Sequence, residues 1–410
     1  MTINKIEILL LIAVVVAMAA RRLRLPYTVG LVVAGVILSL LPFAPHLELT
    51  RELIFSVFLP PLIFEAAFYI EWPKLKKDFP VVLVLATVGL WLSAGVTALG
   101  MHYLARWEWI GALVFGVLIA ATDPVSVIAT FKEAGVKGRI RLLVEAESLL
   151  NDGMAAVAFA VLVAIGTGTS LGVSGATKML ALTIVGGVVC GALIAGAALL
   201  LAGRTNDHLV EITLTTLAAY GSFLLAEHFH FSGVLATLTA GLIIGNRGHL
   251  GSLSDKGREA VGSFWEYAAF LANSLIFLLI GLRLAQQNFR TVLITSLIAI
   301  VLVILARATA VYPTSALFVR SKLRIERRHQ HILFWGGLRG ALALALALSL
   351  PPQIPHREEI ITVAFAVVAF SIFVQGLTIK PLLRRMGELT EPKSIRNIEI
   401  NQKNNHDLQN

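Results

Sequence analysis

The stretch Glu147-Ser148-Leu149-Leu150-Asn151-Asp152-Gly153 places two carboxylates, a hydroxyl and an amide inside a long apolar segment. If a membrane helix begins near Arg141, Asp152 lies eleven residues further along. At about 1.5 Å per residue that is roughly 16 Å deep, near the middle of a hydrocarbon layer about 30 Å thick. An ionisable group at that depth is costly, and this makes Asp152 a candidate functional residue.

The composition indicates an all-α polytopic membrane protein. Of the 410 residues, 57% are hydrophobic and only 14% are charged, which does not fit a soluble domain of this size. The apolar segments are too long and too continuous for the strands of a barrel. We therefore expect about thirteen transmembrane helices, at 5–20, 27–42, 53–70, 79–102, 110–131, 142–165, 176–202, 209–228, 231–246, 263–282, 289–319, 329–350 and 359–383.

The basic residues predict how the chain is oriented. Of the 34 Lys and Arg, 25 fall in one set of alternate loops and the tail, 7 fall in the other set, and the rest lie inside segments. The positive-inside rule then places the C-terminus in the cytoplasm and the N-terminus outside. The net charge of +9 follows from this topology and does not imply a nucleic-acid partner. We expect residues 1–385 to form the transmembrane domain and 386–410 a short, disordered cytoplasmic tail.

Two segments carry signals for a helix that breaks in mid-membrane. In the fifth, Asp123 precedes Pro124, a pair typical of a helix start, so we expect two half-helices with an unwound crossing. Such a break would free carbonyls, for example that of Thr122, to face a cation; an ordinary proline kink is the alternative. The twelfth contains three glycines around Arg339, within 336–340. Breaks at matching places in two halves of opposite direction indicate a transporter with an inverted repeat of spans 1–6 and 8–13.

Helical spacing divides the polar stretch into two adjacent faces. Glu147 and Asn151 share one face, and Ser148 and Asp152 share the other. A buried arginine needs an anion, so we expect Glu147 to form a structural ion pair with Arg339. The other face would then present Ser148 and Asp152 to an ion.

Several further polar residues receive a less specific interpretation. Glu65 follows two prolines and either completes a cation site or serves as a structural hydrogen-bonding group. Arg307 and Glu266 are expected to be structural, and Glu145 to reach the cytoplasmic surface beside Arg141. We find no nucleotide-binding loop, no serine-histidine pair at membrane depth and no metal-ligand spacing, and we expect neither enzymatic activity nor a cofactor.

Three motifs together resemble those of a known family. They are Ala121-Thr122-Asp123-Pro124, the opening stretch 147–153, and Gly336-Gly337-Leu338-Arg339-Gly340-Ala341. In this order they resemble NhaP-type sodium/proton antiporters over about residues 5–385. The resemblance implies the inverted-repeat antiporter fold with two discontinuous core helices. It also implies a homodimer in the plasma membrane, in which a core of spans 4–6 and 11–13 moves against a dimerisation domain made of the remaining spans.

The resemblance also assigns roles residue by residue. Asp152 matches the aspartate that binds the cation and the proton, and Asn151 matches the asparagine that marks the electroneutral branch. The further cation-site positions are Thr122, Asp123, Ser148 and Glu65, and the structural ion pair is Glu147 with Arg339.

The predicted function is secondary antiport of protons against sodium or lithium, serving pH and sodium homeostasis. It would be electroneutral and proceed by alternating access, with cation and proton competing at Asp152. Potassium/proton exchange is the alternative, because oxygen geometry rather than residue type selects the ion radius. A cation channel with an acidic selectivity ring is disfavoured, because no pore-loop repeat is present.

Overall fold

The computed structural model describes residues 2–23, 25–41, 49–123, 127–128, 131, 135–169, 172–247 and 253–388. Within these ranges the chain forms helices and no strands, so the predicted all-α class is confirmed. Each predicted apolar segment contains at least one helix, including 231–246, which is short and rich in glycine. Most of the predicted tail, 389–410, lies outside the described residues.

The first half of the chain runs from α1 to α9, and two of its helices continue through a π-helical turn. The elements are α1 (Thr2–Leu23), α2 (Tyr27–Ser39), η1 (Leu53–Phe58) with α3 (Leu59–Tyr69), α4 (Trp72–Val84) with η2 (Leu85–Gly89) and α5 (Leu90–Leu104), α6 (Trp109–Ala120), α8 (Arg139–Gly166) and α9 (Val173–Ala202).

The second half contains the other interrupted segment. The elements are α10 (His208–His228), α11 (Gly233–Arg247), α12 (Asp255–Leu284), α13 (Leu293–Ala316), α14 (Arg327–Trp335), α15 (Ala341–Leu348), α16 (Arg357–Phe370), η4 (Ser371–Gln375) and α17 (Gly376–Arg385).

Seven described helices are long and apolar enough to cross a membrane: the continuous 72–104 and 357–385, and α8, α9, α10, α12 and α13. The interrupted segments fall short because their halves are brief. α6 has 12 residues, α14 has 9 and α15 has 8, and at about 1.5 Å per residue each spans roughly 20 Å or less. The number thirteen therefore stays a prediction as a count of membrane crossings.

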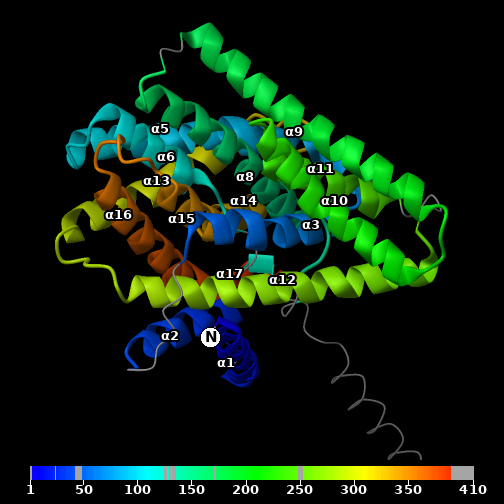
Figure 1. Ribbon diagram of the computed structural model, residues 1–410. Coiled ribbons are helices and arrows are strands. Elements are labelled where there is room, and N and C mark those ends of the chain that lie inside the picture. Colours follow the sequence, from blue (N-terminus) through cyan, green and yellow to red (C-terminus); the bar gives the residue numbers. More distant parts are fainter. Residues whose placement is uncertain are drawn as a thin grey trace, which may run out of the picture.

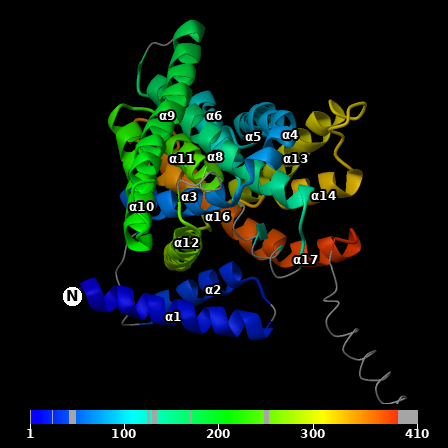
Figure 2. The ribbon, with the colours of Figure 1, turned by 90° about the vertical axis from the view of Figure 1, so that its right-hand side faces the viewer.

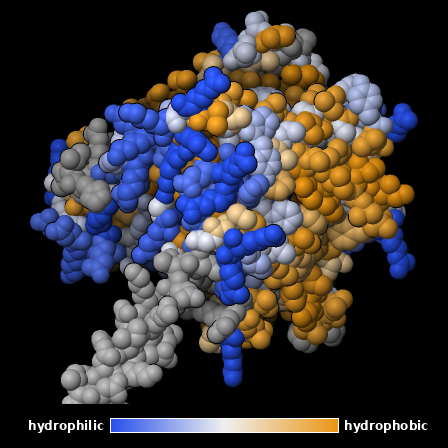
Figure 3. Space-filling view, turned by 180° about the vertical axis from the view of Figure 1, so that it is seen from behind, coloured by the Kyte–Doolittle hydropathy of each residue, from blue (hydrophilic) through white to orange (hydrophobic). Residues whose placement is uncertain are grey.

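The surface has the apolar character expected of a protein in lipid. Large hydrophobic side chains are widely exposed on the outer helices, for example Leu200 on α9 at 73% and Ile294 on α13 at 76%. Figure 3 shows a broad hydrophobic region beside an area where hydrophilic side chains gather. An apolar surface of this extent is solvated by lipid chains and not by water.

The helices pack in two groups that meet along α8, α3 and α12. In one group α12 packs against α2, α3 and α10, and α11 packs against α3, α9 and α10. Figures 1 and 2 show α1 and α2 side by side, with α12 between them and the remaining helices. In the other group α5 packs against α6 and α13, and α15 packs against α6 and α16. This second group contains helices of predicted spans 4, 5, 11, 12 and 13, and the division into a core and a dimerisation domain stays a prediction.

Two glycines let α2 and α12 approach each other closely. A Cβ atom on Gly35 would lie 2.2 Å from the carbonyl oxygen of Leu278, and one on Gly281 would lie 2.2 Å from that of Val32. Small residues at a helix crossing are the usual means of close backbone contact in membranes. The contact fixes α2 against α12, on the side turned away from most of the other helices.

We predict that Gly35→Ala destabilises the protein by about 1–3 kcal/mol, because the added methyl group forces α2 away from α12. The measurement is the thermal unfolding midpoint of the detergent-solubilised protein. Gly196→Ala in α9 is the control, since a Cβ there meets nothing within 4 Å. Equal midpoints for the Gly35 variant and the control would contradict the assigned crossing.

Candidate ion-binding site

The two interrupted segments cross next to the polar stretch of α8. α6 ends at Ala120, and residues 121–123 are not helical. α14 ends at Trp335 and α15 begins at Ala341. The N–H of Asp123 donates a hydrogen bond of 2.7 Å to the carbonyl of Leu338, which joins the two unwound segments. Both predicted breaks are therefore present where expected, although Pro124 itself lies outside the described residues.

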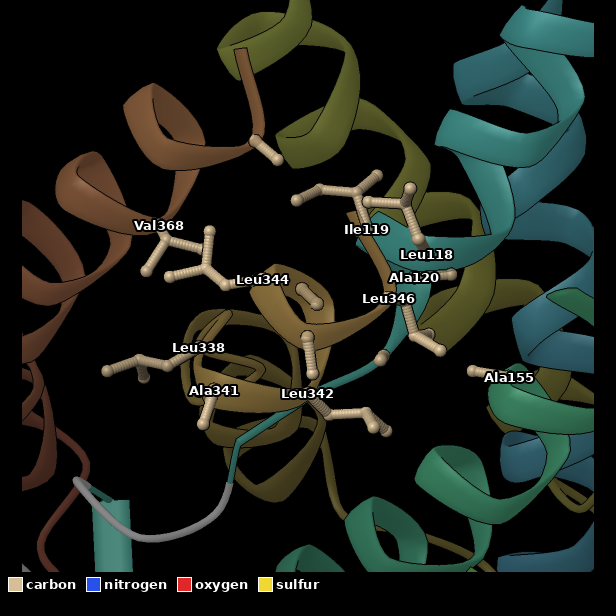
Figure 4. Packing of buried hydrophobic residues seen from close by; sticks show 14 of the residues in the cluster. Leu118, Ile119, Ala120, Ala155, Leu338, Ala341, Leu342, Leu344, Leu346 and Val368 are labelled. Carbon is tan, nitrogen blue, oxygen red and sulfur yellow. The ribbon is translucent and has the colours of Figure 1, made fainter. Parts of the chain in front are cut away.

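Hydrophobic packing holds the second half-helix at this crossing. Figure 4 shows Leu344 and Leu346 of α15 among side chains of neighbouring helices, including Ile119 of α6 and Val368 of α16. Leu344, Ile119 and Val368 are at most 1% exposed. The apolar side chains fix the direction of α15, and the polar groups of the crossing fix its beginning.

The structure corrects the predicted role of Arg339. The side chain is buried, and its Nη1 donates to the carbonyl oxygens of Ala120 at 3.1 Å and Ala121 at 3.2 Å. The last carbonyls of a helix lack intrahelical partners and carry partial negative charge. Arg339 therefore neutralises the end of α6, and the predicted ion pair with Glu147 is wrong in its partner.

Glu147 pairs instead with Arg307 of α13. The guanidinium binds both carboxylate oxygens, at 2.8 Å from Nη1 to Oε1 and 3.1 Å from Nη2 to Oε2. Nη2 also donates to the carbonyl of Leu333 in the last turn of α14, at 2.9 Å. Both side chains of the ion pair are buried. The pair thus joins α8, α13 and α14, and Arg307 is structural as predicted, with a partner that its sequence position did not indicate.

Asp123 lies at the other broken helix end. A Cβ on Gly340, the residue that precedes α15, would lie 2.1 Å from Oδ2 of Asp123. The carboxylate therefore sits close to the N-terminus of α15, where the free N–H groups carry partial positive charge. Only a residue without a side chain leaves room for it. Asp123, from the first unwound segment, thus places a negative charge at the N-terminus of α15. Arg339, from the second, places a positive charge at the C-terminus of α6.

A hydrogen-bonded network joins α8 to the first unwound segment through Ser148, Thr122 and Asn151. The hydroxyl of Thr122 donates to that of Ser148 at 3.1 Å, and Ser148 donates to the carbonyl of Thr122. Nδ2 of Asn151 donates to the carbonyl of Ala120 at 3.2 Å. The structure brings these predicted residues together, but the Thr122 carbonyl accepts from Ser148 and is not left open as expected.

Asp152 keeps an unused oxygen. Its carboxylate accepts a hydrogen bond from the backbone of Thr122, while Oδ1 is buried with no hydrogen-bond partner in the described part of the chain. Buried polar atoms nearly always have a partner, so an unsatisfied carboxylate oxygen indicates a position for a ligand or a proton. Oδ1 of the adjacent Asn151 is unsatisfied in the same way.

A cavity of about 1750 Å³ leads to Asp152. Its wall includes Glu65 from α3, Thr122 and Asp123 from the crossing, and Asp152 from α8. These carboxylate and hydroxyl oxygens are ligands suited to a hard cation. The cavity also contacts basic residues of the loops assigned to the cytoplasm, namely Lys74, Lys77, Lys137, Arg139, Arg141 and Lys380.

Comparison with known proteins gives the family. A family model described as the transmembrane sodium/hydrogen exchanger matches residues 8–385. The chain belongs to this family. The Na(+)/H(+) antiporter ApNhaP of Aphanothece halophytica is 40% identical over 371 residues, which cover 89% of this chain and 70% of that protein. The Na(+)/H(+) antiporter NhaH of Halobacillus aidingensis is 34% identical, covering 93% of this chain and 97% of that protein.

A solved structure shows that the fold is shared as well. The sodium proton antiporter MjNhaP1 of Methanocaldococcus jannaschii superimposes with a TM-score of 0.76 at 21% identity, covering 95% of this chain and 99% of that one. The antiporter fold expected for this sodium/hydrogen exchanger is thereby confirmed, and so is the resemblance to NhaP-type antiporters that the three motifs indicated.

The revised ion pair gives a testable prediction. Glu147→Gln and Arg307→Gln should each destabilise the protein by about 3–5 kcal/mol, because each leaves a buried charge unpaired. The double variant should be less damaging than the sum of the two single variants. Thermal unfolding of the four proteins measures this coupling. A larger coupling between Glu147 and Arg339, measured with Arg339→Gln in the same way, would contradict the pairing.

Proposed function

We propose that this exchanger carries sodium inward or outward against protons across the cell membrane, with Asp152 binding either ion in turn. The observation that carries the proposal is the buried Oδ1 of Asp152, which has no hydrogen-bond partner among the described residues and lies beside a large cavity. A carboxylate held away from water is unfavourable in its free charged form. Binding a proton or a dehydrated cation removes that penalty, and this couples the two fluxes.

The arrangement of the cavity supports an alternating-access mechanism. Its basic residues belong to loops that the positive-inside rule assigns to the cytoplasm, so this arrangement represents an inward-facing state. Access would alternate when the group containing α4–α6, α8 and α13–α17 moves against the group containing α1–α3 and α9–α12. The N-terminus would lie outside and the C-terminus in the cytoplasm. The proposed assembly is a homodimer formed through the group that contains α1–α3 and α9–α12.

The buried charges support an electroneutral exchange. Asp123, Glu147 and Asp152 face Arg307 and Arg339 around the crossing. Glu147 is paired with Arg307, and Arg339 and Asp123 lie at the two broken helix ends, so the proposed exchange involves the charge of Asp152, which either one sodium ion or one proton neutralises. The corrected ion pair does not alter this proposal, because Glu147 is paired in either case.

Sodium is favoured over potassium as the cation. The relatives described above bear names that specify sodium and protons. The carboxylate and hydroxyl oxygens of Glu65, Thr122, Asp123 and Asp152 are hard ligands that suit alkali-metal cations in general, so the preference for sodium rests on the relatives.

We predict that Asp152→Asn abolishes sodium-dependent proton movement, since an amide neither binds a proton nor supplies the negative charge. The assay uses everted membrane vesicles with an internal acidic gradient reported by acridine orange. Asp255→Asn is the matched control, because Asp255 is exposed in the first turn of α12. Wild-type dequenching by the Asp152 variant, at equal expression, would refute the assignment.

We also predict that the exchange rate is independent of membrane potential. In proteoliposomes a clamp of about 100 mV would change the free energy of moving one net charge by about 2.3 kcal/mol. Rates of sodium-driven proton movement at zero and at this clamped potential should be the same for an electroneutral exchanger. A several-fold difference between them would show that net charge moves in each cycle.

A further inference from the structure

An ion pair lies on the same face of α8 as Asp152, nearer to the end assigned to the cytoplasm. Arg141, Glu145, Leu149 and Asp152 are spaced three or four residues apart, and all of them line the cavity. Nε of Arg141 lies 2.8 Å from Oε1 of Glu145. Asp152 follows Glu145 by seven positions, which corresponds to roughly 10 Å along the helix. A cation that enters this cavity therefore passes the pair before it reaches Asp152.

The position of the pair lets its charges act inside the cavity. The side chain of Arg141 is 29% exposed and that of Glu145 is 15% exposed. Charges that are partly enclosed by protein are screened less than charges on an open surface. A cleft with low-dielectric walls also focuses the field of the charges that line it, which changes the local concentration of ions.

Two other ion pairs between described residues also line the cavity, and they differ in their surroundings. Lys74 and Glu71 form a largely exposed pair at 2.6 Å. Arg139 binds Asp78 at 2.7 Å and also donates to the carbonyl oxygens of Leu323 and Arg324, which ties it to the loop before α14. The pair on α8 is the one that shares a helix face with Asp152. The charges of this pair can therefore change the local concentration of the cation on its way to Asp152.

We propose that Arg141 and Glu145 form an electrostatic filter that sets the apparent affinity for cytoplasmic sodium. Glu145 attracts the cation into the part of the cavity between the cytoplasmic end of α8 and Asp152, and Arg141 offsets this attraction. The two charges oppose each other, so removing one leaves the other to dominate. The inference rests on the proposed function, because it requires that sodium reaches Asp152 through this cavity.

The test measures sodium dependence in everted vesicles, in which the cytoplasmic face is accessible. We expect Arg141→Gln to lower the KM for sodium and Glu145→Gln to raise it, each by about threefold to tenfold, as expected for a unit charge about 10 Å away at intermediate dielectric. The maximal rate should be unchanged. Both shifts should shrink when choline chloride raises the ionic strength, because added salt screens the charge.

Three further variants separate a filter from a simple structural contact. The double variant Arg141→Gln/Glu145→Gln should return the KM close to wild type, since no net charge is left. Arg141→Lys, which keeps the charge, should leave the KM unchanged. Arg328→Gln is the control for charge on the same side of the membrane, because Arg328 pairs with Glu326 away from the cavity lining.

Opposite shifts that disappear in the double variant support the filter. Shifts of the same sign, a loss of maximal rate without a change in KM, or no shift at all in the single variants would overturn it. A wild-type protein that shows no sodium-dependent exchange would refute the proposed function itself, and this outcome is read from the same vesicles before any variant is compared.

Discussion

The structure depends on how two helices can be broken in the middle of a membrane protein. Each break exposes backbone groups that lipid cannot hydrogen-bond, at a cost of several kcal/mol for each unsatisfied group. Here the two unwound segments satisfy one another. Arg339, from the second break, binds the carbonyls that end α6, and Asp123, from the first, lies at the N-terminus of α15. A backbone hydrogen bond from Asp123 to Leu338 joins them.

This exchange of charges explains why a carboxylate oxygen of Asp152 remains available. Arg339 is engaged by helix carbonyls, Glu147 by Arg307, and Asn151 by the carbonyl of Ala120. The unsatisfied Oδ1 of Asp152 therefore lies among groups whose positions are already fixed. Ligands held by such a surrounding shell keep their geometry when the bound ion changes. A rigid frame around one exchangeable carboxylate is the arrangement that competition between a proton and a cation requires.

The sequence indicated most of this fold because its signals are local. Hydropathy located the helices, the Asp-Pro step located the end of α6, and the glycines around Arg339 located the break before α15. The helical spacing from Glu147 to Asp152 separated the buried carboxylate of the ion pair from Asp152, which lines the cavity, but it did not indicate that Ser148 is hydrogen-bonded to Thr122. These features depend on residues that are neighbours in the chain, and they can be read without knowing how distant helices pack.

The pairing of the buried charges could not be read in the same way. Arg307 and Arg339 both lie inside apolar segments, so depth alone does not say which of them contacts Glu147. The answer depends on the rotation of α13 relative to α8 and on the carbonyls at the end of α6, which attract Arg339. The use of the Thr122 carbonyl by Ser148 is a second tertiary contact of this kind. Both corrections concern partners, and the roles of Glu65, Thr122 and Asp123, which line the cavity with Asp152, stay predictions.

The central claim is that a proton and a sodium ion compete for one carboxylate. The most direct measurement is proton release when sodium is added to the purified protein in weakly buffered detergent solution, together with sodium binding measured by calorimetry. The account predicts one proton released for each sodium ion bound, and neither binding nor release in the Asp152→Asn variant. Sodium binding without proton release, or release that persists in that variant, would contradict it.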